Sequence, residues 1–127
     1  MELPQKLKYA ASHEWIAVHG DGTATVGITA VATEQLGDLV YVELPQVGAR
    51  VTRGANCAVV ESTKAAADVY APVGGEVVAA NAELSAHPER VNESPYEKGW
   101  LFKVKLADAA ELDTLLERDA YAKSAGV

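Results

Sequence analysis

The stretch ESTKAAADVYA, residues 61–71, sets one lysine, Lys64, between a short polar run and three consecutive alanines. Local propensity favours a helix here, because Ser62 can cap one and alanine loses no side-chain entropy inside it. The flanking segments AVV and VYA are instead typical of strands, and a helix of about two turns is marginal alone. The residues leave both structures open, and the function depends on which one forms.

Length, composition and charge limit the class of protein. A chain of 127 residues fits one domain over 1–127, and no apolar run approaches the roughly 18 residues of a membrane span. No basic-then-apolar leader opens the chain, so we expect a cytoplasmic protein. The net charge of −7 disfavours nucleic acid and anionic membranes as partners. An acidic surface can steer a protein to basic patches on partners, or simply keep it in solution.

Most of the chain has the pattern of short strands separated by turns. Asp21 and Gly22 predict a hairpin turn, and Thr33 to Gly37 a short helical turn. Residues 81–99 are polar and contain prolines, which suits turns or a brief helix, and WLFKVKLA (100–107) suits a final strand. A C-terminal helix is expected at about 108–122, with fraying of the last four residues. Its signals are a cap at Asp108 and an apolar stripe of Leu112, Leu115 and Leu116.

No motif for catalysis or metal binding is present in the sequence. HEWIA begins like a metalloprotease helix, but Ala17 stands where the second histidine would be. The three histidines are scattered and Cys57 is the only cysteine, so no zinc spacing exists, and Cys57 is expected to be a small buried hydrophobe. We expect no metal and no active site of the protein's own.

Lys64 has three physical interpretations. It can be an ordinary solvated lysine, or a Schiff-base nucleophile, which requires a desolvated pocket. It can also be the attachment point of a swinging cofactor, which requires a protruding amine on a rigid hairpin with small neighbours. Residue types alone do not decide among them.

Four segments in register resemble the glycine cleavage system H protein family. VVESTKAAADVYAPVGGEV (59–77) is similar to the lipoylation segment, with Lys64 at the lipoyl-lysine position, and the other three are LKYAASHEWI, VGITAVATEQLGDLVYVELPQVG and PERVNESPYEKGWLFKVK. The resemblance covers about 6–120. It implies a mainly β fold, a barrel-sandwich hybrid of the lipoyl/biotinyl-carrier type with short helices and a C-terminal helix. Lys64 would then lie at a hairpin tip, so the helix around it should lose to tertiary context.

The resemblance also implies a carrier without catalytic activity, with (R)-lipoate bound covalently to Lys64. A pyridoxal-phosphate-dependent glycine decarboxylase would pass an aminomethyl group to the lipoyl arm, and a folate-dependent aminomethyltransferase would take it. Dihydrolipoamide dehydrogenase would reoxidise the arm, and a lipoate-attaching enzyme would install it. Because each partner is visited in turn, the docking contacts should be transient.

Further site residues follow from the same resemblance. Recognition by the lipoate-attaching enzyme is implied for Glu61, Ser62 and Ala65. A cleft that shelters the loaded arm is implied for Ser12, Glu14 and Asp68, although the two carboxylates could instead only cap turns or face solvent.

Several alternatives compete with this interpretation. A lipoyl domain of a 2-oxo acid dehydrogenase usually has Asp before the lysine, whereas Thr63 stands there. A biotin carrier usually has methionines on both sides, whereas the only methionine is Met1. A lipoyl relay that donates the cofactor to 2-oxo acid dehydrogenase complexes, and an unmodified β-barrel interaction module, both stay open.

Overall fold

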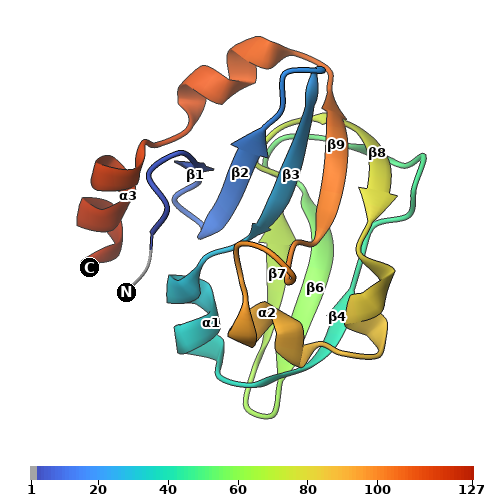
Figure 1. Cartoon of the computed structure of the whole chain (residues 1–127), viewed down its shortest axis with the longest axis vertical. Coiled ribbons are helices and arrows are strands. Elements are labelled where there is room, and N and C mark those ends of the chain that lie inside the picture. Colours follow the sequence, from blue (N-terminus) through green and yellow to red (C-terminus); the bar gives the residue numbers. More distant parts are fainter. Residues whose placement is uncertain (1–2) are drawn as a thin grey trace.

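The computed structural model describes residues 3–127 and consists mainly of two antiparallel β-sheets (Figure 1). Residues 1 and 2, which the expected domain includes, lie outside the described part. The larger sheet has the strand order β1 (Lys8–Tyr9), β2 (Glu14–Val18), β3 (Thr23–Ile28), β9 (Phe102–Leu106), β8 (Gly75–Ala80) and β5 (Arg50–Val51). The smaller sheet has the order β4 (Leu39–Glu43), β6 (Asn56–Ser62) and β7 (Ala66–Tyr70). The expected mainly β barrel-sandwich fold is confirmed.

Short helices close the ends of this sandwich. They are α1 (Ala30–Leu36), α2 (Glu89–Glu93) and α3 (Arg118–Ala125), with 3₁₀ helices η1 (Ala82–Ser85) and η2 (Ala109–Thr114). Figure 1 shows α1 and α2 at the end of the molecule where the β6–β7 hairpin turns, and α3 beside β1. Helix α1 is capped at its start by Thr29, whose side chain accepts a hydrogen bond from Ala32 N–H, and at its end by Gly37. The sequence therefore predicted the end of this helix but placed its start at Thr33, three residues after Ala30.

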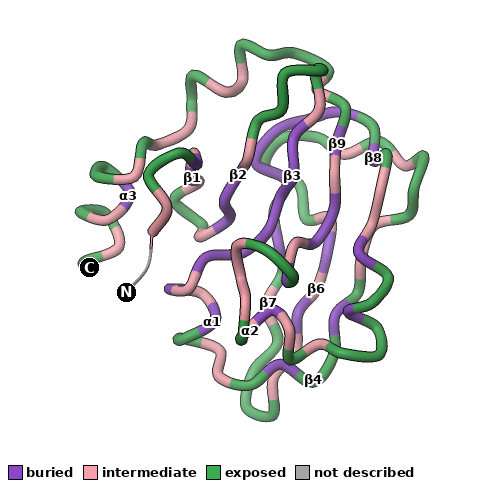
Figure 2. Tube along the Cα trace, in the orientation of Figure 1, coloured by how far each residue is buried: buried purple, intermediate pink, exposed green. Residues whose placement is uncertain are grey.

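The core lies between the two sheets, and a second apolar cluster lies under α3. Buried residues follow β2, β3 and β9 in Figure 2, and the side chains of the main cluster are mostly valine, leucine and isoleucine. Tyr9, Trp15 and Tyr121 are the large members of the second cluster, which α3, β1 and β2 enclose. Fully burying such side chains stabilises the fold by about 1.5–3 kcal/mol each, so α3 is held to the domain mainly by its one buried residue, Tyr121.

The segment around Lys64 is a β-hairpin, and the helix that local propensity favoured does not form. Ala66 pairs with Glu61 and Ala67 with Val60 across β6 and β7. Val60 and Val69 are each 1% exposed, so the two strands bury an apolar face against the core. An isolated short helix could not bury that face, and tertiary packing therefore overrides the alanine propensity.

The C-terminal segment differs from the single helix expected at 108–122. Asp108 does cap, because its carboxylate accepts a hydrogen bond from Ala110 N–H at 3.0 Å, but the turns after it are 3₁₀. Leu116 then pairs with Tyr9 through two backbone hydrogen bonds of 2.8 and 2.7 Å, which interrupts the helix. Helix α3 continues to Ala125 and a left-handed Gly126 caps it, so two of the four residues expected to fray belong to the helix.

Candidate functional site

Lys64 lies at the turn of the β6–β7 hairpin, exposed to solvent. Ser62 N–H donates to Ala65 C=O at 2.7 Å and closes the turn. The Ser62 hydroxyl oxygen accepts hydrogen bonds from the N–H groups of Lys64, at 3.3 Å, and Ala65, at 3.1 Å. The turn is thus held by its own residues, and the primary amine projects from it with small neighbours on one side.

A second segment supports the stem of the Lys64 side chain. A Cβ atom placed on Gly37, whose φ is +79°, would lie 3.6 Å from Cε of Lys64. The side-chain amide of Asn92 fixes this segment, because it accepts from Leu39 N–H at 2.9 Å and donates to Gly37 C=O at 2.8 Å. No sequence pattern identified Asn92, because its role depends on contacts made 53 and 55 residues away.

Ser12, Glu14 and Asp68 line one cavity of about 110 Å³ between α1 and the hairpin strands. They come from the β1–β2 loop, from β2 and from β7, so only the folded chain brings them together. The other lining residues are mainly apolar: His13, Ile28, Ala32, Gln35, Leu36, Val60, Ala67 and Val69. A mainly apolar cleft with a few polar groups at one end is suited to hold an aliphatic arm that carries a polar head.

Glu14 is the most buried polar group of this cavity, with 1% of its surface exposed. The Ser12 hydroxyl donates to one carboxylate oxygen, and Tyr70 N–H donates to the other at 3.3 Å. Burial raises the pKa of Glu14, while these hydrogen bonds act in the opposite direction. Such a carboxylate can accept a hydrogen bond from a cationic group that enters the cleft. Asp68, in contrast, is exposed at the rim.

His13, which lies between Ser12 and Glu14 in the sequence, has a left-handed backbone with φ = +78°. This conformation is uncommon for any residue except glycine. Its N–H donates to Ala10 C=O, and its C=O accepts from Thr29 N–H, both at 3.0 Å. Its imidazole Nδ1 lies 2.6 Å from the hydroxyl of Tyr121. The sequence carried no sign of this conformation, because tertiary contacts impose it.

A larger cavity, of about 250 Å³, lies on the other side of Ser12 and Glu14. Its remaining walls come from Arg53, the segment after β7 and residues 114–116. It includes neither Asp68 nor any residue of α1, whereas the smaller cavity is lined by α1 and by both strands of the hairpin that carries Lys64.

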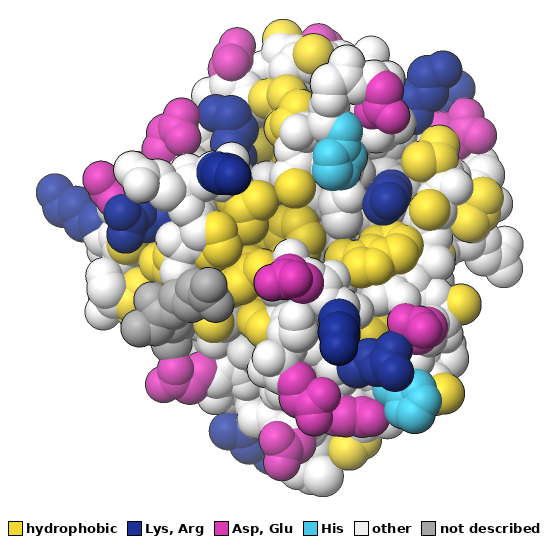
Figure 3. All heavy atoms as spheres, viewed as in Figure 1, with side chains coloured by type: hydrophobic (Ala, Val, Ile, Leu, Met, Phe, Trp, Pro, Cys, Tyr) yellow, Lys and Arg dark blue, Asp and Glu magenta, His cyan; other side chains and the backbone are white. Residues whose placement is uncertain are grey.

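Other kinds of site find little support. Within residues 3–127, no group of three or more His, Cys, Asp or Glu side chains could hold a metal ion. In the same range no helix is long and apolar enough to cross a membrane. Cys57 is half-buried rather than buried as expected; burial still raises the pKa of its thiol to about 12, and the thiol donates to Val69 C=O, which suits a structural residue. Acidic and basic side chains are interspersed on the face shown in Figure 3.

Two facing sheets with an exposed lysine at a hairpin turn define a barrel-sandwich domain of the lipoyl-carrier type. The family model for the glycine cleavage H-protein matches residues 7–126, and the chain therefore belongs to this family. It is 56% identical over 122 residues to the glycine cleavage system H protein of Pseudoalteromonas translucida (strain TAC 125), covering 96% of this chain and 95% of that one. It is also 56% identical to the H protein of Escherichia coli O45:K1 (strain S88 / ExPEC), covering 94% and 92%.

Solved structures agree with this assignment. The crystal structure of a glycine cleavage system H protein from Mycobacterium marinum superposes with a TM-score of 0.91 and is 42% identical in sequence. The match covers 98% of this chain and 100% of that chain. Membership of the family supports a lipoyl-carrier role in the glycine cleavage system.

Proposed function

We propose that this chain is a non-catalytic carrier whose lipoyl group is attached to Lys64 and which serves the three enzymes of glycine cleavage. The single observation that carries the proposal is the exposed amine of Lys64 on a rigid, self-closed turn. Amide formation there would remove the lysine charge, so that the arm could enter buried sites of the partners. Tethering would raise the concentration of the arm at whichever partner has docked.

The lipoyl group would supply a disulfide that takes up the aminomethyl group at the pyridoxal-phosphate-dependent decarboxylase, delivers it to the aminomethyltransferase and is restored by dihydrolipoamide dehydrogenase. The protein's contribution is to present the arm and to shelter it. Glu61, Ser62 and Ala65 flank Lys64 along the hairpin, which supports a role in recognition by the lipoate-attaching enzyme. We include the cytoplasm in the proposal, because these partners use folate and NAD found there.

Ser12, Glu14 and Asp68 are proposed to bind the head of the loaded arm. Their common cavity supports this role, because apolar walls suit the aliphatic arm and the Glu14 carboxylate suits the ammonium group. A bound ammonium would in turn favour the ionised form of Glu14, which burial otherwise disfavours. Exclusion of water from the cleft would slow hydrolysis, in which water breaks the carbon–sulfur bond and releases formaldehyde, ammonia and the free thiol.

The test is an intact-mass measurement on protein made in a lipoylating host. We expect a mass increase equal to one lipoyl group, lost completely in Lys64→Arg, which keeps the charge but offers no acylable amine. Lys98→Arg, a change at another exposed lysine, is the matched control and should be fully modified. Lipoylation that persists in Lys64→Arg would refute the assignment of the site.

A lipoyl relay for 2-oxo acid dehydrogenase complexes would require the same hairpin. Reconstitution separates the two roles: the lipoylated chain should support exchange of the glycine carboxyl carbon with bicarbonate when mixed with glycine decarboxylase. Transfer of lipoate to a 2-oxo acid dehydrogenase without that exchange would favour the relay.

A further inference from the structure

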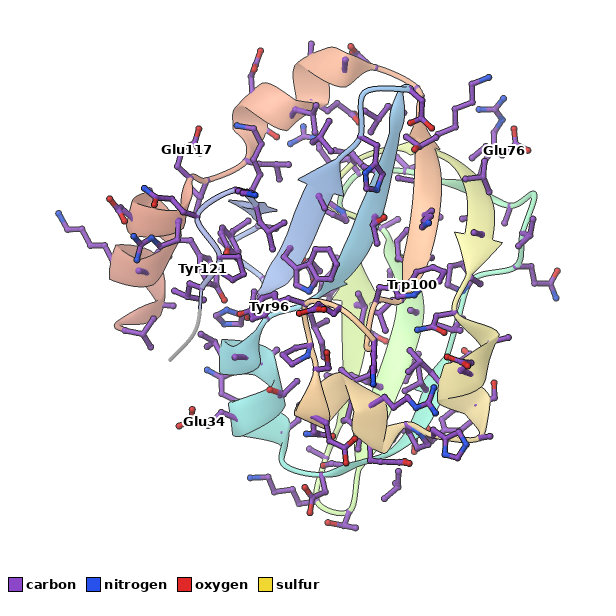
Figure 4. The ribbon with its side chains drawn as sticks, in the orientation of Figure 1. Glu34, Glu76, Tyr96, Trp100, Glu117 and Tyr121 are labelled. Atoms are coloured by element: carbon purple, nitrogen blue, oxygen red, sulfur yellow. The ribbon has the colours of Figure 1, made fainter. Side chains whose placement is uncertain are left out.

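The hydroxyl group of one α3 residue, Tyr121, contacts two residues beside the candidate cleft. Tyr121 is the fully buried residue of α3, and its hydroxyl lies 2.6 Å from His13 Nδ1 and 2.8 Å from Thr29 Oγ1. Figure 4 shows Tyr121 and Tyr96 on the side of the molecule where α3, β1 and the start of α1 meet. The Tyr121 ring is itself fixed by stacking on Tyr9, with ring centroids 4.7 Å apart.

The hydrogen bonds around Tyr121 form a chain with one consistent direction. Ala32 N–H donates to Thr29 Oγ1 at 3.4 Å, so the Thr29 hydroxyl proton is available to the Tyr121 oxygen. In this direction we assign the Tyr121 hydroxyl as the donor to Nδ1 of neutral His13, with the ring proton on Nε2. Burial lowers the pKa of His13 and raises that of Tyr121, and both shifts favour these neutral forms. One tyrosine hydroxyl therefore connects α3, the β1–β2 loop and the cap of α1.

Both residues that the Tyr121 hydroxyl contacts position walls of the cavity. His13 lines the cavity itself and lies between Ser12 and Glu14. Thr29 caps α1, which contributes Ala32 and two further lining residues, Gln35 and Leu36. A left-handed non-glycine residue persists only where its surroundings over-determine it. The bond from Tyr121 is the side-chain contact that helps to hold His13 in that conformation.

We propose that Tyr121 is a positioning residue for the arm cleft: through His13 and Thr29 it sets how closely the β1–β2 loop and α1 approach, and so how well the cleft excludes water. This inference rests on the proposed function, because it assumes that the loaded arm lies in this cavity. A second tyrosine also helps to position α1, since the hydroxyl of Tyr96 accepts a hydrogen bond from Ala30 N–H at 3.0 Å.

The test compares Tyr121→Phe with a matched control, Thr25→Val. Both changes remove a hydroxyl–imidazole contact, because Thr25 Oγ1 lies 2.7 Å from His19 Nε2, but the second contact is remote from the cleft residues. Formaldehyde release from the aminomethyl-loaded chain is measured over time. Loss of one hydrogen bond that holds the cleft closed should make release about fivefold faster in Tyr121→Phe. Thr25→Val should release at the wild-type rate, and all chains should be lipoylated alike.

A second measurement, the ¹⁵N chemical shift of His13, tests the same inference on the chain without a loaded arm. The ¹⁵N chemical shift of His13 Nδ1 should show an accepted hydrogen bond in the wild-type chain and in Thr25→Val, and should move to the value of an unbonded nitrogen in Tyr121→Phe. His13→Asn keeps a polar partner for Tyr121 and tolerates positive φ, whereas His13→Gly tolerates it without the partner. We therefore expect His13→Asn to protect the loaded arm better than His13→Gly.

The outcomes separate this inference from the proposed function. Equal release from the wild-type chain and its urea-unfolded form would refute the shielding cleft and the inference with it. Release that is slower in both folded chains than in the unfolded form, but equal in wild type and Tyr121→Phe, would refute the inference alone. An unchanged His13 shift in Tyr121→Phe would also refute it.

Discussion

The turn at Lys64 and the loop at Ser12 to Glu14 are the two ends of the proposed path of the arm, and they are built in opposite ways. The hydrogen bonds of the turn join residues no more than three positions apart, and its central residues are exposed. The side-chain contacts of the loop include residues 56 and 108 positions away, and Glu14 is buried. One end is a local structure that faces solvent, and the other is a tertiary structure that excludes it.

This difference matches what each end is proposed to do. In the proposed role a modifying enzyme and three further partners would have to reach the lysine, and its neighbours in the turn are small and exposed. A labile group requires fixed partners and little water, which only packing from several elements can provide. Substitutions in the loop should therefore alter stability and protection together, while substitutions in the turn should alter neither by much.

The largest effect is expected for Glu14→Ala. It removes the acceptor of Ser12 and of Tyr70 N–H, so the free energy of unfolding should fall by about 2–3 kcal/mol, measured by urea denaturation. Loss of the aminomethyl group should become faster, while lipoylation continues. Asp68→Ala, at the exposed carboxylate of the same cavity, is the control and should change stability by less than about 0.5 kcal/mol. An equal effect of both changes would remove the distinction between buried and rim carboxylates.

A smaller effect on the free energy of unfolding is expected from a change in pH. Burial raises the pKa of Glu14 above its ordinary value of 4.5 in the folded chain. The stability that this group contributes is therefore fully present below the unfolded pKa and is lost as the pH rises through the folded one. Glu14→Gln does not titrate, so the unfolding free energy of the unloaded wild-type chain should fall relative to that of Glu14→Gln as the pH rises above the ordinary pKa of 4.5. A difference that is constant, or that grows in favour of wild type, would contradict the raised pKa.

Ser62→Ala should have the smallest effect. It removes the hydroxyl that accepts from Lys64 N–H and Ala65 N–H, but both groups can turn to water at this exposed site. The unfolding free energy should fall by less than about 1 kcal/mol, and Thr63→Ala, which leaves these hydrogen bonds in place, should change it less still. A fall as large as that of Glu14→Ala would mean that the turn depends on more than its own residues.

The same difference explains what could be predicted from the sequence. Lys64 was assigned to a hairpin tip only through the family resemblance, since the three alanines favoured a helix. The valines of β6 and β7 decide the structure, because their burial against the core exceeds the small helix propensity of alanine. In the C-terminal segment the leucine stripe predicted one helix, but Leu112 and Leu115 pack on the main core while Leu116 joins the second cluster. Two separate cores require a break that periodicity does not reveal.

Some of the residues at the candidate site were predicted from the sequence, and others were found only in the structure. Ser12, Glu14 and Asp68 do share a cavity, as the resemblance implied, although their roles stay proposals. His13, Asn92 and Tyr121 were missed. Each acts through a contact with a distant segment, and none belongs to a motif that specifies its partner.

By itself, the sequence predicted short strands and several turns, because alternation, glycine and proline act over a few residues. The carrier fold and the hairpin at Lys64 followed from the family resemblance of four segments in register. Only the tertiary structure decided that residues 62–67 form no helix, that the C-terminal segment bends at Leu116 and that His13 is left-handed. Those features depend on apolar burial and hydrogen bonds between residues far apart in the chain, whose free energy no local pattern contains.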